Sequence, residues 1–283
     1  LHIGILENDF GAINVDMLML HELRGDQCEL EMVAGGCDAD CHRRRFKTKL
    51  IAMGMCGYDR VIVEPSGIFD VDEFFDVLRE EPLDQWYEIG SVITIMNAKL
   101  EDTLSEEAEY LLASEAANAG CVVLSRSQDA SPEEIAKTRA HLNCALQAVH
   151  CSRQFGDEII EKNWEDFTEQ DLERIQNSGY HVEDYTKLHF PEEERFQSVC
   201  VMNQEMTRQE LEKKVQQLFT EASYGNVFRV KGFLELPDGN WMELNATRHE
   251  MTFTICTEGK VVIVIGEKLN QPMIEEVLGG TAI

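Results

Sequence analysis

Two acidic segments near the start of the chain each follow a short apolar run. The sequence EPSG begins at Glu64, and the sequence ENDFG begins at Glu7. An apolar run closed by turn residues is typical of a strand buried on both faces, as in a parallel sheet. Open α/β sheets bind ligands at the carboxyl ends of their strands, so both glutamates are candidates for a shared divalent-cation site. The alternative is that both are solvated loop residues.

The segment that contains Glu64 has further features of a phosphate-hydrolysing site. Pro65 and Gly67 allow the backbone to turn sharply, and a helix is predicted over residues 71–79. A strand, an acid, a glycine turn and a helix, in this order, place a carboxylate that faces metal or water beside backbone N–H donors. Glu64 and Gly67 are therefore the candidate catalytic residues.

A third segment, GGCDADCH at residues 35–42, brings two thiols, two carboxylates and an imidazole together. Thiolate and imidazole are preferred ligands of Zn²⁺ and other thiophilic divalent metals. Cys37 and Cys41 are four residues apart, so a helix that begins here would place both on one face. With His42 they supply three ligands to the metal and leave its fourth coordination position open. The alternative is a capped helix N-terminus with two idle thiols.

The composition restricts the class of protein. The chain has 283 residues and a formal charge of −28, which argues against binding to nucleic acid or to an anionic membrane surface. No apolar run approaches the ~20 residues of a membrane span. Nine cysteines, an odd number scattered through apolar runs, are typical of free thiols in a cytoplasmic protein. The length predicts two domains.

The order of the predicted elements explains how the candidate residues would be positioned. Strands alternate with helices over residues 1–150, which predicts an α/β domain with a mostly parallel sheet. Its strands include a buried one at 121–124, and its last helix starts at a Ser-Pro-Glu-Glu capping sequence and runs to about Ala145. Ala148 and Val149 are predicted to form a last strand. We expect the chain to begin inside the fold, at its first strand.

The second half of the chain has a different pattern. Residues 151–194 are acidic and contain apolar residues spaced for short helices, so they are predicted to form a helical linker. Residues 195–283 combine several strands with helices at 207–219 and 271–278, which predicts a smaller α+β domain. A Pro-Asp-Gly-Asn turn at 237–240 predicts a hairpin.

The order of these motifs resembles the CobW family of metal-handling P-loop GTPases, in the same class as HypB and UreG. The resemblance covers nearly the whole chain. Its four parts are the switch-like segment at 7–11 with Asp16, the cysteine motif at 36–41, the Walker-B-like segment at 64–67, and a C-terminal domain with matching residues at 231–233, 241 and 262–266.

Three departures from the family pattern bear on function. The sequence contains no Gly-x-x-x-x-Gly-Lys-Ser/Thr phosphate loop, which in the family precedes the strand that opens this chain. We therefore expect an upstream segment to be missing from the given sequence. The cysteines are spaced Cys-x-x-x-Cys, where the family has Cys-x-Cys-Cys. Ser125, Arg126 and Gln128 stand where the family has Asn-Lys-x-Asp for guanine recognition, and Gln128 offers one acceptor oxygen where Asp offers two.

The resemblance implies a GTP-binding metallochaperone or metal-insertion protein that couples hydrolysis to metal transfer. Its cofactors would be GTP with Mg²⁺, held in part by Glu7 and Asn8, and Zn²⁺ or another thiophilic metal. Its partners would be a nucleotide, a metal ion and a client metalloprotein. The alternative is a degenerate relative that no longer hydrolyses nucleotide and acts as a metal- or protein-binding module. As given, without a phosphate loop, the chain is expected not to hydrolyse GTP.

Overall fold

The computed structural model describes most of the chain, in two compact units. The described residues are 1–9, 20, 23–34, 39–65, 71–156, 158–188, 190, 196–202, 206–235, 239–256 and 261–282. One unit comprises residues Leu1–His42, Arg60–Ser66 and Phe190–Ile283, and the other comprises Arg43–Asp59 and Gly67–His189. None of the described helices is long and apolar enough to cross a membrane.

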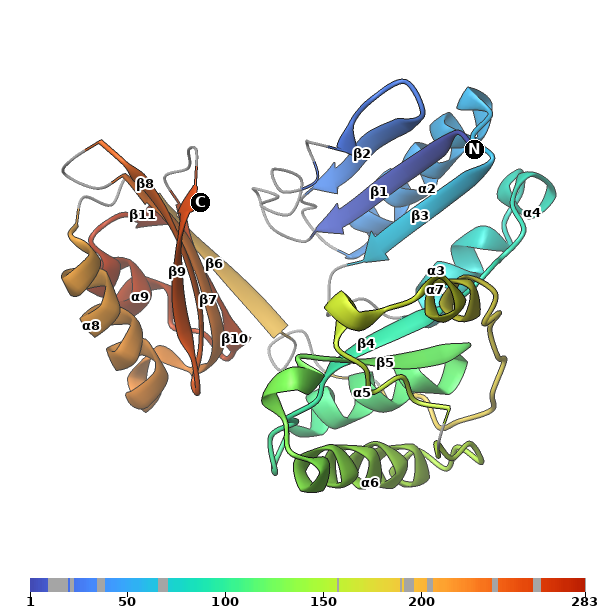
Figure 1. Cartoon of the computed structure of the whole chain (residues 1–283). Helices are drawn as coiled ribbons and strands as arrows, with labels where there is room; N and C mark the ends of the chain where they lie inside the picture. Colours follow the sequence, from blue (N-terminus) through green and yellow to red (C-terminus); the bar gives the residue numbers. More distant parts are fainter. Residues whose placement is uncertain are drawn as a thin grey trace. The chain divides into compact units, whose positions relative to one another are not determined.

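The N-terminal residues form a three-stranded parallel sheet with the order β2-β1-β3 (Figure 1). Its strands are β1 (Ile3–Asp9), β2 (Cys28–Ala34) and β3 (Arg60–Pro65). Leu6 in β1 and Val33 in β2 are almost fully buried, as expected for apolar residues on the covered face of a parallel sheet. The strands predicted at 1–6 and at 61–63 are therefore confirmed.

The prediction that the strand at 61–63 is buried on both faces is wrong. Among the described residues β3 pairs with β1 alone and so stands at the edge of its sheet, and 48% of the surface of Ile62 is exposed. An edge strand has a neighbouring strand on one side only, so fewer side chains cover its residues. β4 (Ile93–Asn97), in a second sheet, has a similar pattern, because Thr94 and Met96 are buried while Ile95 is 68% exposed.

The second unit contains a two-stranded parallel sheet, β4 paired with β5 (Cys121–Ser125). The predicted parallel sheet is thus found as two sheets in the described part of the chain. Helices α5 (Glu106–Asn118) and α6 (Pro132–Ala148) contact each other beside it (Figure 1). Other described helices before β4 are α2 (Ala39–Cys56), α3 (Val71–Leu78) and α4 (Leu83–Trp86).

Helix α6 begins with the predicted capping box, in which the Ser131 hydroxyl accepts the Glu134 N–H and the Glu134 carboxylate accepts the Ser131 N–H. The helix continues through Ala148, so the last strand predicted at 148–149 is wrong. The Val149 N–H donates to the carbonyl of Ala145 (3.3 Å), so the helical hydrogen-bond pattern continues through these residues.

Residues 151–156 and 158–188 are the last described residues of the second unit. They include η3 (Trp164–Asp166) and α7 (Glu169–Gln176), which confirm the short helices predicted there. Beyond α7, the Tyr185 hydroxyl donates to Asp72 (2.8 Å) and the Thr186 N–H donates to the carbonyl of Val149 (2.7 Å). The segment is therefore attached to the unit by side-chain and backbone hydrogen bonds.

The C-terminal region forms a six-stranded antiparallel sheet with the order β11-β6-β10-β7-β8-β9. Two helices lie on one face of it, α8 (Arg208–Thr220) and α9 (Gln271–Leu278), and η5 (Ala222–Tyr224) follows α8 (Figure 1). The strands are β6 (Phe196–Met202), β7 (Asn226–Glu235), β8 (Trp241–Thr247), β9 (Met251–Cys256), β10 (Val261–Glu267) and β11 (Thr281–Ala282).

The main core of this region lies between the helices and the sheet, where Leu211, Val215 and Leu218 of α8 are fully buried. Parallel sheets in the N-terminal region and a separate antiparallel α+β region confirm the predicted fold class. The predicted domain limits at 150 and 195 remain a prediction.

Candidate functional site

The candidate acids Glu7 and Glu64 lie directly opposite each other in the parallel pair of β1 and β3. Adjacent strands of a sheet are separated by ~4.8 Å, and residues in register project to the same face. The backbone register therefore places the two residues beside each other at the carboxyl end of the sheet. Glu7 is 3% exposed, whereas Glu64 is exposed.

The local sequence explains this arrangement. The apolar residues Ile5 and Ile62 are paired two positions earlier in the same register, and a shift by one residue would turn every side chain of a strand to the opposite face. The apolar runs thus fix which residues meet at the strand ends. Two neighbouring carboxylates repel each other, and a hard divalent cation such as Mg²⁺ accepts such oxygen ligands. The donor set therefore fits Mg²⁺.

The neighbouring candidates are described only in part. Asn8 is paired with Pro65 in the same ladder, one residue beyond the glutamates. The side chain of Asn8 lies outside the described part of the structure. Gly67, the second candidate catalytic residue, lies outside the described residues, so its role stays a prediction.

The predicted thiophilic metal site is also described only in part. Cys41 and His42 belong to the first turn of α2, but their side chains lie outside the described part of the structure. Cys37 lies outside the described residues altogether. Within the described ranges, no three or more His, Cys, Asp or Glu side chains gather in a way that would hold a metal ion. The ligand set Cys37, Cys41 and His42 therefore stays a prediction.

The residues predicted to recognise a base follow the end of β5. The Ser125 hydroxyl donates to the carbonyl of Met96 on β4 (3.2 Å), so this hydroxyl links the two strands. Arg126 has a left-handed backbone (φ 60°), and its Nε lies 3.6 Å from a carboxylate oxygen of Asp129. Gln128 is exposed. The turn therefore presents the side chain of Gln128 to solvent and turns that of Ser125 into the sheet.

Ser127, in the same turn, was not among the predicted site residues. It is 8% exposed, and its hydroxyl has no hydrogen-bond partner in the described part of the chain. A buried hydroxyl without a partner is uncommon and indicates a polar group able to accept or donate to a ligand. No sequence signal identifies it, because its burial depends on the left-handed backbone of Arg126.

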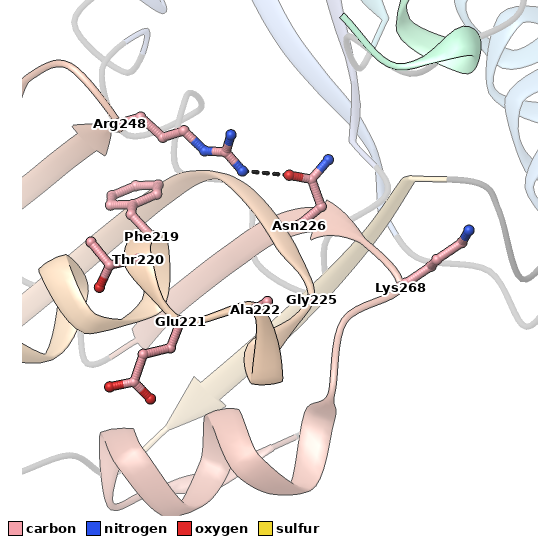
Figure 2. Close-up of a pocket in the computed structure, with 8 residues that line it drawn as sticks. All are labelled: Phe219, Thr220, Glu221, Ala222, Gly225, Asn226, Arg248 and Lys268. Carbon is pink, nitrogen blue, oxygen red and sulfur yellow. Dashed lines mark hydrogen bonds between the residues drawn. The ribbon is translucent and has the colours of Figure 1, made fainter.

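A cavity of about 470 Å³ lies on the C-terminal region, at the end of α8 (Figure 2). Its polar groups do not converge on one point. Arg248 donates to the side-chain oxygen of Asn226 and, at 3.2 Å, to the carbonyl of Val227. Figure 2 shows the carboxylate of Glu221 directed away from Arg248, and Lys268 on the far side of the cavity. This cavity does not have the geometry of a catalytic centre.

Comparison with known families gives two matches. Residues 1–154 match the model described as the CobW/HypB/UreG nucleotide-binding domain, and residues 189–282 match the cobalamin synthesis protein cobW C-terminal domain. No protein of curated function matches the sequence.

Two solved structures are similar to the chain at low identity. The Zn(II)-bound YjiA GTPase from E. coli is 17% identical over 98% of this chain and 89% of that chain, with a TM-score of 0.38. A Zn(II)-bound triple mutant of the YjiA GTPase is 18% identical over the same shares of both chains, also with a TM-score of 0.38.

Proposed function

Because the chain belongs to the CobW/HypB/UreG family, we propose that it is a GTP-binding metallochaperone that couples a nucleotide cycle to delivery of a thiophilic metal to a client protein. The observation that supports this most directly is the register of Glu7 opposite Glu64. It puts two carboxylates at the carboxyl end of a parallel sheet within the matched nucleotide-binding domain, where α/β sheets bind ligands.

The proposal assigns separate tasks to the candidate residues. Glu7 and Glu64 would hold Mg²⁺, which supplies charge neutralisation for the phosphates when bound. Glu64 would also orient water, with the turn at Gly67 providing backbone N–H groups. The turn after β5 would face the base through Gln128 and the buried hydroxyl of Ser127.

Metal transfer is assigned to Cys37, Cys41 and His42. A set of three ligands leaves a coordination position open for a ligand of the client, whereas a structural zinc site is closed by four. Thiols must lose their protons to bind metal, so loading should release protons. The candidate nucleotide and metal ligands lie close together in the sequence, with the metal ligands between the strands that carry Glu7 and Glu64.

The carboxylate site is tested with Mn²⁺, a paramagnetic substitute for Mg²⁺, titrated into the 283-residue chain and followed by electron paramagnetic resonance. Glu64→Gln and Glu7→Gln should each weaken binding severalfold, because each removes one anionic ligand. Glu29→Gln is the matched control, since Glu29 lies on β2 of the same sheet, opposite Gly4 near the amino ends of the strands. Equal weakening by all three variants would contradict the assignment.

The thiol site is tested by titration with Zn²⁺ against a chromophoric chelator. The wild-type chain should bind one Zn²⁺ with release of protons, and the double variant Cys37→Ser with Cys41→Ser should lose the site. The control is Cys56→Ser with Cys144→Ser, which removes two exposed free thiols elsewhere. Unchanged affinity in the Cys37 and Cys41 variant would refute the ligand assignment.

The second candidate function is a binding module that has lost hydrolysis. One observation favours it: Gln128 replaces the acid that recognises guanine in the family. Measured GTP turnover would exclude one of the two functions. We expect none from the 283-residue chain, and turnover that is abolished by Glu64→Gln would exclude the binding-module function.

A further inference from the structure

Strand β9 forms one edge of the six-stranded C-terminal sheet, where its described neighbour is β8 on one side (Figure 1). Its sequence is MTFTIC, which has no charged residue, no proline and no glycine. Proteins usually protect edge strands against further pairing with charges, prolines or bulges. The composition of β9 is typical of a strand that pairs with another chain.

The register of the β8–β9 hairpin shows which backbone groups face outward. The N–H of Thr247 donates to the carbonyl of Glu250 (2.8 Å), which closes the turn between the strands. In an antiparallel ladder, hydrogen-bonded and non-hydrogen-bonded pairs alternate. Thr252 and Thr254 are therefore the residues whose backbone groups pair with β8, and the backbone groups of Met251, Phe253 and Ile255 are directed away from the sheet.

The side chains of β9 are unevenly covered. Met251 and Phe253 pack against the core beneath α8, and the guanidinium of Arg208 lies 4.3 Å from the ring centre of Phe253. Ile255, on the same face of the strand, is 90% exposed. It is an apolar side chain at the end of the edge strand, beyond the cover that α8 provides.

We propose that β9 pairs antiparallel with β9 of a second copy of this chain, with Phe253 at the two-fold axis. In this register Phe253 lies opposite its own copy, and Ile255 lies opposite Met251 of the second copy. All three outward-facing residues then form backbone hydrogen bonds between the chains. The contact is isologous, because the same surface is used on both copies.

The side chains across this two-fold axis are complementary. On the face beneath α8, Phe253 lies opposite Phe253 of the second copy, and Ile255 lies opposite Met251. On the other face, Thr252 lies opposite Thr254. Aromatic, aliphatic and Thr–Thr pairs opposite each other stabilise antiparallel strands. Ile255 in particular becomes covered by an apolar neighbour.

The net charge of the chain also favours this segment as the contact between copies. Two chains with a formal charge of −28 repel each other, so the point of closest approach must carry little charge. β9 satisfies this condition because none of its six residues is Asp, Glu, Lys, Arg or His. Six-residue pairing buries a small area, so the dimer should be concentration-dependent and strengthened by salt.

Sedimentation velocity of the 283-residue chain at increasing concentration tests the proposal. The wild type should show a monomer–dimer equilibrium, and Ile255→Lys should shift the midpoint at least tenfold higher in concentration, because it places two lysines at the contact. Val182→Lys is the control, since Val182 is 69% exposed on the other unit and the charge change is the same. A wild type that stays monomeric, or a dimer that Ile255→Lys does not weaken, would overturn the proposal.

Amide hydrogen exchange distinguishes β9 pairing from a dimer formed elsewhere. Exchange at Met251, Phe253 and Ile255 should slow as the concentration rises, while exchange at Thr252 and Thr254, already paired with β8, should change little. Circular dichroism of Ile255→Lys confirms that it folds. The assigned register would be contradicted if the sample is dimeric but amide exchange at Met251, Phe253 and Ile255 does not change with concentration.

Discussion

Among single residues, the carboxyl group of Glu115 has an unusual environment in helix α5. Burial raises its pKa from 4.5 to about 7. Since the folded-state pKa lies above the unfolded value, the stabilising effect of the neutral form is complete below pH ~4.5 and is lost as the pH rises through 7. Glu115 should therefore make the unfolding free energy fall between these two pH values.

Replacing Glu115 by Gln removes this titration. The unfolding free energy of Glu115→Gln relative to the wild type should increase from pH 4.5 to pH 7.5, by at most roughly 3 kcal/mol since one pKa unit is worth about 1.4 kcal/mol. Urea denaturation at several pH values measures it. Glu173→Gln is the control, with the same charge change at an exposed position, and a flat difference for Glu115→Gln would contradict the prediction.

The candidate residues differ in how far the sequence could predict them. The proximity of Glu7 and Glu64 was predictable, because each ends an apolar strand and parallel strands share a carboxyl edge. The buried hydroxyl of Ser127 was not, since its burial depends on the left-handed turn at Arg126. The inward hydrogen bond of Ser125 depends likewise on the neighbouring strand β4.

Among the elements, the segment that follows α7 is held against the start of β5 by a close backbone contact. The N–H of Gly120 donates to Val92 (2.7 Å), and a Cβ at Gly120 would lie 2.1 Å from the carbonyl oxygen of Gly179. Gly179 in turn accepts the N–H of Val92 (2.9 Å). A side chain at Gly120 therefore requires the backbone of the segment to move.

Gly120→Ala should lower the unfolding free energy by about 1–3 kcal/mol, the usual cost of overpacking. It should also accelerate proteolysis near residues 177–181, because the contact that holds them is lost. Gly90→Ala is the matched control, since no atom lies within 4 Å of a Cβ built there. Equal stability of the two variants in urea denaturation would contradict the prediction.

Most elements were predictable from local patterns, and the exceptions have physical causes. The capping boxes at Ser131 and Thr207 place helix starts correctly, because a cap is a local interaction. The burial of β3 and the end of α6 were not predictable in the same way. The first depends on which strands become neighbours, and the second depends on the packing of residues far apart in the sequence.

For the whole molecule, the formal charge of −28 should make stability depend on ionic strength. Raising NaCl from 0.01 to 0.15 M shortens the Debye length from about 30 to about 8 Å, which screens repulsion between distant carboxylates. The Tm should rise, with about 1 kcal/mol corresponding to ~2–4 °C for a chain of this size.

Calorimetric scans in NaCl, KCl and MgCl₂ at matched ionic strength measure this effect. NaCl and KCl should give equal gains because screening does not depend on the ion. A further gain with MgCl₂ that is lost in Glu64→Gln would report binding at the paired carboxylates. A Tm that falls as NaCl increases would contradict the prediction that repulsion dominates.

The strand order of the C-terminal sheet has a consequence for synthesis of the chain on the ribosome. β7, β8 and β9 pair with their immediate neighbours in sequence, whereas β6 pairs with β10, and β10 also completes the free side of β7. Local pairs close quickly because their connecting loops are short. The three-stranded meander can therefore form as it emerges, while β6, although synthesised first, waits without its sheet partner until β10 has left the exit tunnel.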